Sequence, residues 1–148
     1  EIKKCKELAK NYGQPLKSIV FPANIEGNFK VLHEQGINSF RGYNKTNSIG
    51  FPIKKNELWD IHSSMQIKLS GSVKQDKIHA FNLIDQVIQY GGVVHIWFHL
   101  FEINKIVLEQ ILHPIICYAR QKSEDGLLWI ATMNEIAQHC ERQKTIKR

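Results

Sequence analysis

Residues 74–99, KQDKIHAFNLIDQVIQYGGVVHIWFH, place an amphipathic segment directly before a short apolar run. The spacing of four apolar residues predicts a helix over residues 74–90 with one buried face, made by Ile78, Phe81, Ile84 and Ile88. The Gly91-Gly92 pair is a stop signal for that helix. The following run, Val93 to His99, is rich in β-branched and aromatic residues and predicts a strand.

The rest of the chain repeats this alternation of helices and strands. Hydrophobic periodicity predicts helices over 3–12, 25–35 and 104–121 and strands over 18–21, 37–40, 58–61 and 127–131. A capping box from Thr132 to Glu135 predicts a last helix. Segment 42–56 is polar and contains glycine, so we expect a loop that forms an insertion within a single domain of residues 1–148. The alternation is typical of parallel βα units, and the fold class is therefore α/β.

Four or five strands are too few to close a βα barrel. The chain is then either a small open sheet or part of a barrel whose other strands lie upstream. In the second case unpaired strand edges remain, and we expect self-association through these open sheet edges.

Charge and composition narrow the classes of function. The net charge of the 148 residues is +6, but Lys and Arg are scattered without interleaved aromatics, so we expect no nucleic-acid partner. The longest apolar stretch, residues 93–101, is far shorter than the ~20 residues of a membrane-spanning helix. Three cysteines form no CxxC pair, which favours free thiols over a disulfide framework or zinc knuckle. No signal peptide is visible; the compartment stays open, with the cytoplasm favoured.

His99 is the strongest chemical candidate, because it ends the strand predicted over residues 93–99. Alternation along a strand places His95, Trp97 and His99 on one side. In βα barrels that side faces the interior, and chemistry occurs at the carboxyl ends of the strands. An imidazole there could act as acid or base near neutral pH. The alternative is a core histidine that hydrogen-bonds a backbone carbonyl.

The HxxxH spacing of His95 and His99 invites a metal interpretation. Four residues of strand span about 13 Å, whereas each zinc ligand must lie about 2 Å from the ion. The two histidines therefore cannot bind one metal if they lie on a strand.

The chain resembles the C-terminal part of the polysaccharide deacetylase catalytic domain. Matching blocks follow one another in the family's order: Ser18-Ile-Val-Phe-Pro-Ala-Asn24, Val31-Leu-His-Glu-Gln-Gly36, Phe40-Arg-Gly42, Leu58-Trp-Asp-Ile-His-Ser-Ser-Met65, Val94-His-Ile-Trp-Phe-His99 and Leu128-Trp-Ile-Ala-Thr-Met133 with Glu135. The ordered set covers nearly the whole chain.

This resemblance implies part of a distorted (β/α) barrel that removes N-acetyl groups from amino-sugar saccharides. The family uses a divalent metal, usually zinc, held by an Asp and two His, with an Asp base and a late-strand His as acid. By match, that acid is His99. The family's Asp-Asp and helical HxxxH motifs do not occur, so the zinc ligands are absent from this chain, and we expect the chain alone to be inactive.

Two matched positions depart from the family. Ala23 stands where the family has an arginine that orients the catalytic carboxylate, and Leu100 stands where proline is common. The first change removes a charged hydrogen bond. Arg41 is close enough in sequence to substitute, although it also fits an ordinary surface residue.

Further substrate contacts are expected from strand ends. Asp60, His62 and Ser63 could contact sugar hydroxyls, and Trp97 could stack on a sugar ring. Ordinary loop polarity and barrel packing are the respective alternatives. The resulting hypothesis is a partial N-deacetylase domain with an N-acetylated saccharide as partner. A non-catalytic saccharide-binding or interaction module is the second hypothesis, and a small basic nucleic-acid-binding domain is a third, supported by net charge alone.

Overall fold

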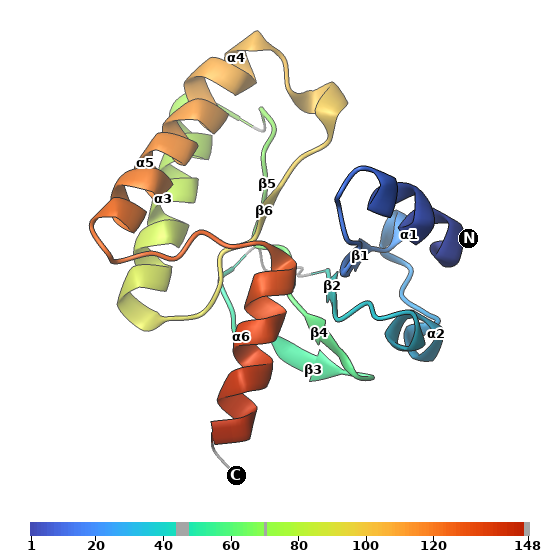
Figure 1. Cartoon of the computed structure of the whole chain (residues 1–148). Coiled ribbons are helices and arrows are strands. Elements are labelled where there is room, and N and C mark those ends of the chain that lie inside the picture. The colour runs from blue at the N-terminus through green and yellow to red at the C-terminus, as the bar shows by residue number, and fades with distance from the viewer. Residues whose placement is uncertain (44–47, 70, 147–148) are drawn as a thin grey trace. The chain divides into compact units, whose positions relative to one another are not determined.

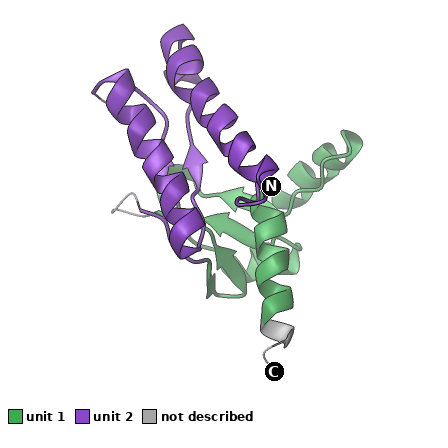
Figure 2. Cartoon of the chain, turned by 90° about the vertical axis from the view of Figure 1, so that its left-hand side faces the viewer, with its two compact units in different colours: residues 1–43, 52–62, 131–148 green, residues 44–51, 63–130 purple. Residues whose placement is uncertain are grey.

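The computed structural model describes residues 1–43, 48–69 and 71–146 (Figure 1). The chain divides into two compact units (Figure 2): unit 1 is Glu1–Tyr43, Pro52–His62 and Ala131–Arg148, and unit 2 is Asn44–Phe51 and Ser63–Ile130. The molecule combines helices with parallel strands, as the α/β class predicted, and the described residues form no closed barrel. The interpretation of residues 1–148 as a single partial domain stays a prediction.

Unit 1 is built on a four-stranded sheet with the order β1-β2-β4-β3. Its elements are α1 (Ile2–Asn11), β1 (Ser18–Val20), the 3-10 turn η1 (Pro22–Asn24), α2 (Phe29–Glu34), β2 (Ser39–Arg41), β3 (Ile53–Lys55), β4 (Leu58–Asp60) and α6 (Met133–Ile146). Strand β1 pairs in parallel with β2, and β2 with β4, whereas β3 pairs antiparallel with β4. The carboxyl ends of three strands therefore lie at one edge of the sheet.

An aromatic cluster forms the core of unit 1. Phe40 on β2 is fully buried, and its ring lies edge-on to Phe21 at 5.6 Å and to Phe29 at 5.3 Å between centroids. Such edge-to-face contacts add to the free energy gained from apolar burial. Leu32 and Leu58 complete the cluster, so the sheet and α2 share one apolar interior.

Helix α6 is attached to the sheet of unit 1 by polar contacts. Asn134 accepts a hydrogen bond of 2.7 Å from the Asn38 side chain, and Glu141 accepts one of 2.8 Å from the Trp59 indole. The predicted capping box is confirmed: the Thr132 backbone N–H donates to the Glu135 carboxylate, and the Glu135 N–H donates to the Thr132 hydroxyl.

Unit 2 consists of a short parallel strand pair and helices. Its elements are β5 (Met65–Gln66), α3 (Val73–Tyr90), β6 (Ile96–Trp97), the 3-10 turn η2 (Leu100–Glu102), α4 (Lys105–Val107), the π-helical turn η3 (Leu108–Leu112) and α5 (His113–Glu124). Strands β5 and β6 are joined through α3 in a βαβ arrangement. Apolar residues of the helices, including Ile84 and Ile111, pack on Met65 and Ile67 to form a second core.

The predicted strands are partly wrong. The strand expected over residues 93–99 shortens to Ile96–Trp97, and Val93 instead forms an antiparallel bridge with Gly50. Residues 127–131 form no strand, because Leu127 turns back to donate its N–H to the Lys122 carbonyl at the end of α5.

The predicted loop 42–56 contains strand β3, and the segment after Ile61 contains β5. Residues 44–47 of that loop lie outside the described residues. Asn56 and Glu57 both adopt positive φ angles of 47° and 68° in the two-residue turn between β3 and β4. Positive φ at both turn residues is the geometry that allows a tight antiparallel hairpin.

Helix boundaries differ from prediction where the backbone cannot continue as an α-helix. The helix expected over 25–35 begins only at Phe29, after Asn28 in a left-handed conformation (φ 55°), and Ile25 is exposed outside it. The helix expected over 104–121 is interrupted by η3, a turn with π-helical hydrogen bonding that comes shortly before Pro114. Proline has no N–H for the α-helical ladder, which explains the local change of hydrogen bonding.

Candidate functional site

The carboxyl end of β6 carries the predicted acid, His99. Met65 pairs with Ile96 and Gln66 with Trp97, so the two strands run in parallel and end together. The chain leaves β6 at Trp97, and His99 is the residue that precedes the 3-10 turn η2. A residue beside the carboxyl end of a parallel strand is where α/β folds place chemistry.

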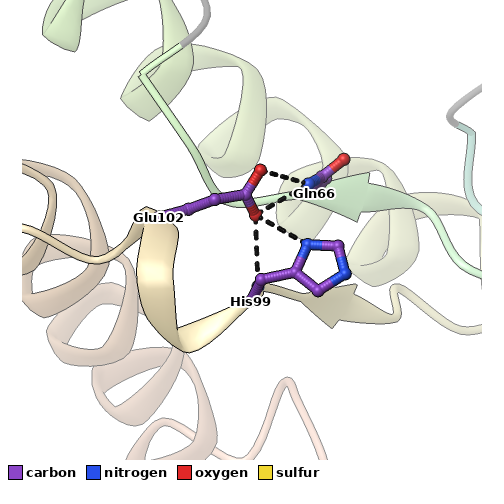
Figure 3. A network of polar contacts seen from close by, with 3 residues as sticks. All are labelled: Gln66, His99 and Glu102. Carbon is purple, nitrogen blue, oxygen red and sulfur yellow. Dashed lines mark hydrogen bonds and ion pairs between the residues drawn. The ribbon is translucent and has the colours of Figure 1, made fainter.

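His99 belongs to a polar network with Glu102 and Gln66 (Figure 3). The Nδ1 atom of His99 lies 3.0 Å from Glu102 Oε2, and the His99 backbone N–H donates to the same oxygen at 3.2 Å. Gln66 Nε2 lies 2.8 Å from each oxygen of the Glu102 carboxylate. The hydrogen bond from Gln66, followed by those from His99, holds the pKa of Glu102 below its ordinary value.

Two aromatic rings flank His99. The Trp97 ring lies edge-on to the imidazole at 4.9 Å between centroids, and Phe101 stacks on it, also at 4.9 Å. The Trp97 contact agrees with the alternation that placed both side chains on one side of the chain. The His99 side chain is nevertheless 48% exposed, so it is not the core histidine of the alternative interpretation.

His95 takes part in the strand framework. Its backbone N–H donates to Ser64 Oγ at 3.0 Å, and its carbonyl accepts from the Ser64 N–H at 2.8 Å. The residue is half-buried and so is not part of the fully enclosed core. Ser63, proposed as a sugar contact, is buried with 5% exposure and cannot reach a ligand without a rearrangement.

The described residues do not fit the zinc that the family resemblance implies. Among residues 1–43, 48–69 and 71–146, no three His, Cys, Asp or Glu side chains gather closely enough to hold a metal ion. The hydrogen-bond partner of the His99 ring is the Glu102 carboxylate, to which Gln66 donates in turn.

Asp60 and Arg41 lie at strand ends in unit 1. Asp60 ends β4, and its Oδ1 accepts the Gly42 backbone N–H at 3.0 Å. Arg41 ends β2 and donates from Nη2 to Asn24 Oδ1 at 3.4 Å. Because β2 and β4 pair in parallel, both residues occupy the carboxyl edge of the same sheet.

Burial changes the ionisation of Asp60. Loss of solvent raises the pKa of its carboxyl above the ordinary value, and the charge of Glu26 acts in the same direction. His62, the Gly42 N–H and Lys55 oppose this shift. The partly buried Arg41 guanidinium has its pKa lowered by desolvation. This edge of the sheet therefore has both a hydrogen-bond acceptor, the Asp60 carboxyl, and hydrogen-bond donors, the Arg41 guanidinium, for a polar ligand.

The turn after β1 has unusual backbone geometry. Ala23, which stands in place of the family's arginine, has a φ of 52°, and Asn24 has a φ of 57°. Left-handed conformations are disfavoured for alanine and tolerated by asparagine. This turn positions the Asn24 side chain to accept the hydrogen bond from Arg41.

Sequence reasoning overlooked Glu102 and Gln66. A glutamate three residues after His99 has the spacing of a capping box, and in the structure the Glu102 side chain accepts the His99 backbone N–H, as the glutamate of such a box does. That spacing is a signal that could have identified Glu102. Gln66 carried no such signal, because its place beside Glu102 depends on the pairing of β5 with β6.

Comparison of the chain with protein-family models, with curated proteins and with solved structures found no match. In the described part of the chain, no helix is long and apolar enough to cross a membrane. The family resemblance thus rests on the ordered sequence blocks alone.

Proposed function

We propose that this chain carries the proton-donor part of a saccharide N-deacetylase, with His99 as the acid. The observation that supports this most directly is the exposed His99 imidazole beside the carboxyl end of β6, with Nδ1 3.0 Å from the Glu102 carboxylate. The ordered sequence blocks support the same reaction class, because His99 occupies the place of the family's acid.

Deacetylation breaks the carbon–nitrogen bond of an amide, and the amine must gain a proton as it leaves. Imidazole is suited to this step because it exchanges a proton near neutral pH. The Glu102 carboxylate beside Nδ1 accepts a hydrogen bond from the ring and so fixes its orientation. The exposed part of the His99 ring is then available to the departing nitrogen.

We assign saccharide contacts to one further residue of unit 2 and, separately, to two residues of unit 1. The Trp97 indole, which is in edge contact with His99, offers an apolar face to a sugar ring. Asp60 and Arg41 supply a hydrogen-bond acceptor and donors suited to hydroxyl groups. Since the described residues do not fit a zinc ion, the proposal gives this chain only the protonation and saccharide-contact roles.

A second candidate is a non-catalytic saccharide-binding module. Ala23 favours it, because this residue lacks the charged group that orients the carboxylate in the family. The two candidates share the ligand and differ in whether a bond is broken.

The test is an assay of acetate release from N-acetylated amino-sugar oligomers by a protein that contains this chain, with zinc supplied. The N-deacetylase proposal expects acetate and free amine in equal amounts. Oligomers that bind without releasing acetate would favour the binding module. Neither binding nor release would reject both proposals.

A further inference from the structure

We infer that Glu102 and Gln66 are positioning residues that keep a hydrogen on Nδ1 of His99 and leave Nε2 as the nitrogen that meets the ligand. The catalytic meaning of this inference rests on the proposed function. The arrangement itself is a property of unit 2 and can be measured without any substrate.

The position of the hydrogen follows from the chemistry of the carboxylate. An ionised carboxylate has only acceptor oxygens, so a hydrogen bond between Glu102 Oε2 and His99 Nδ1 requires the hydrogen to lie on Nδ1. Glu102 is kept ionised by its donors, which hold its pKa below the ordinary value. In the neutral ring Nε2 then has the lone pair, and in the charged ring it has the second hydrogen.

Gln66 keeps the carboxylate in place. Its Nε2 atom lies 2.8 Å from both Glu102 oxygens, and its amide oxygen would repel them, so the amide nitrogen must face Glu102. The backbone of Gln66 is held by pairing with Trp97, and the next N–H, that of Ile67, donates to the Trp97 carbonyl at 2.8 Å. The carboxylate is therefore anchored to the strand pair.

The same Glu102 oxygen fixes the backbone of His99. Oε2 accepts the His99 N–H at 3.2 Å as well as the contact from Nδ1 at 3.0 Å. Backbone and ring of one residue thus meet one oxygen atom, as Figure 3 shows. Stacking with Phe101 further restricts rotation of the ring. A ring held in this way presents the same nitrogen on every encounter, which is the purpose of a positioned acid.

The first measurement is the ring tautomer of His99 in the whole chain, by long-range ¹H–¹⁵N NMR at a pH where imidazoles are neutral. The His99 signals are identified by their loss in His99→Gln. We expect the wild-type ring to bear its hydrogen on Nδ1, although free histidine in water favours Nε2. Hydrogen on Nε2 in the wild type would overturn the inference directly.

Two variants and a control locate the cause. Glu102→Ala removes the acceptor and should move the hydrogen towards Nε2, and Gln66→Ala should produce a smaller move in the same direction. Glu109→Ala removes an exposed carboxylate in the same unit and should leave the His99 signals unchanged. An unchanged tautomer in a folded Glu102→Ala variant would also overturn the inference.

A kinetic measurement links the arrangement to the reaction. In a protein with N-deacetylase activity, Glu102→Ala should lower kcat by about tenfold to hundredfold with little change in KM, and Glu102→Asp should restore part of the loss. An unchanged kcat would reject a positioning role in catalysis. If no deacetylation occurs but the tautomer responds as expected, the proposed function fails while the positioning by Glu102 stands.

Discussion

Two carboxylates, Asp60 at the end of β4 in unit 1 and Glu102 in the turn η2 of unit 2, have pKa values that are shifted in opposite directions. Asp60 in unit 1 accepts one backbone N–H, and loss of solvent is the main influence on its pKa, which rises. Glu102 in unit 2 accepts hydrogen bonds from a side-chain amide, a backbone N–H and an imidazole, and its pKa falls. Their difference teaches that the number of hydrogen-bond donors around a carboxylate sets the direction in which its pKa moves against the effect of burial.

The two units also differ in how they form a core. Unit 1 has four strands and an aromatic cluster around Phe40, whereas unit 2 has two strands of two residues each and an aliphatic core between helices. Unit 2 depends on α3 and α5 for packing, which leaves its short strand pair to orient polar residues such as Gln66.

The largest expected effect is on the aromatic core. Phe40→Ala should lower the free energy of unfolding by ~3–5 kcal/mol, because a fully buried ring with two edge-on partners is lost. The control, Phe51→Ala, removes a ring that is 65% exposed and should cost less than about 1 kcal/mol. Denaturant unfolding gives both values. Equal losses in the two variants would contradict the assignment of the core.

A smaller effect is expected at the close approach between Gly42 and Asp60. A Cβ atom on Gly42 would overlap the Asp60 carboxylate, so Gly42→Ala should cost ~1–3 kcal/mol. Gly27→Ala is the matched control, because a Cβ there meets nothing within 4 Å, and we expect little change. Adding Asp60→Ala should relieve the Gly42→Ala penalty. Additive losses in the double variant would show that the two residues do not interact.

The smallest effects test the two carboxylates through pH. The pKa of Asp60 is raised in the folded protein, so the protonated carboxyl favours the folded state. This contribution to stability is fully present below the ordinary pKa and is lost as the pH rises through the pKa of the folded protein. Wild type should therefore lose stability relative to Asp60→Asn as pH rises through the acid range.

Glu102 should show the opposite slope. Its lowered pKa contributes stability above the ordinary value of 4.5 that is lost as pH falls through the folded value. Wild type should therefore gain stability relative to Glu102→Gln as pH rises. Thermal unfolding from pH 3 to pH 7, our chosen range, measures both differences. If both differences in stability between wild type and variant changed in the same direction with pH, the opposite pKa shifts of the two carboxylates would be contradicted.

Sequence reasoning predicted those elements whose signals are local. Helix α3 was expected over 74–90 and spans Val73–Tyr90, because its apolar face and the Gly91 stop signal that follows it are local to this part of the chain. The capping box of α6 is similarly local. These predictions needed no knowledge of distant parts of the chain.

Strands were harder to predict, because a strand exists only where a partner pairs with it. Residues 93–99 and 127–131 have similar apolar composition, yet only Ile96–Trp97 is paired as a strand. For the same reason β3 was overlooked in a polar segment, where the hairpin with β4 establishes it. Of the candidate site, His99 was found from its place after the apolar run, whereas Gln66 depended on pairing that only the structure reveals.

The most direct test of the central claim compares turnover in a protein that contains this chain with that of His99→Ala. A positioned acid contributes about 10²–10⁴-fold, and turnover should fall by that factor while zinc content and the thermal midpoint stay unchanged. His33→Ala, an exposed histidine on α2, is the matched control and should retain full turnover, whereas His95→Ala should mainly lower the thermal midpoint. Near-normal turnover of His99→Ala would contradict the account.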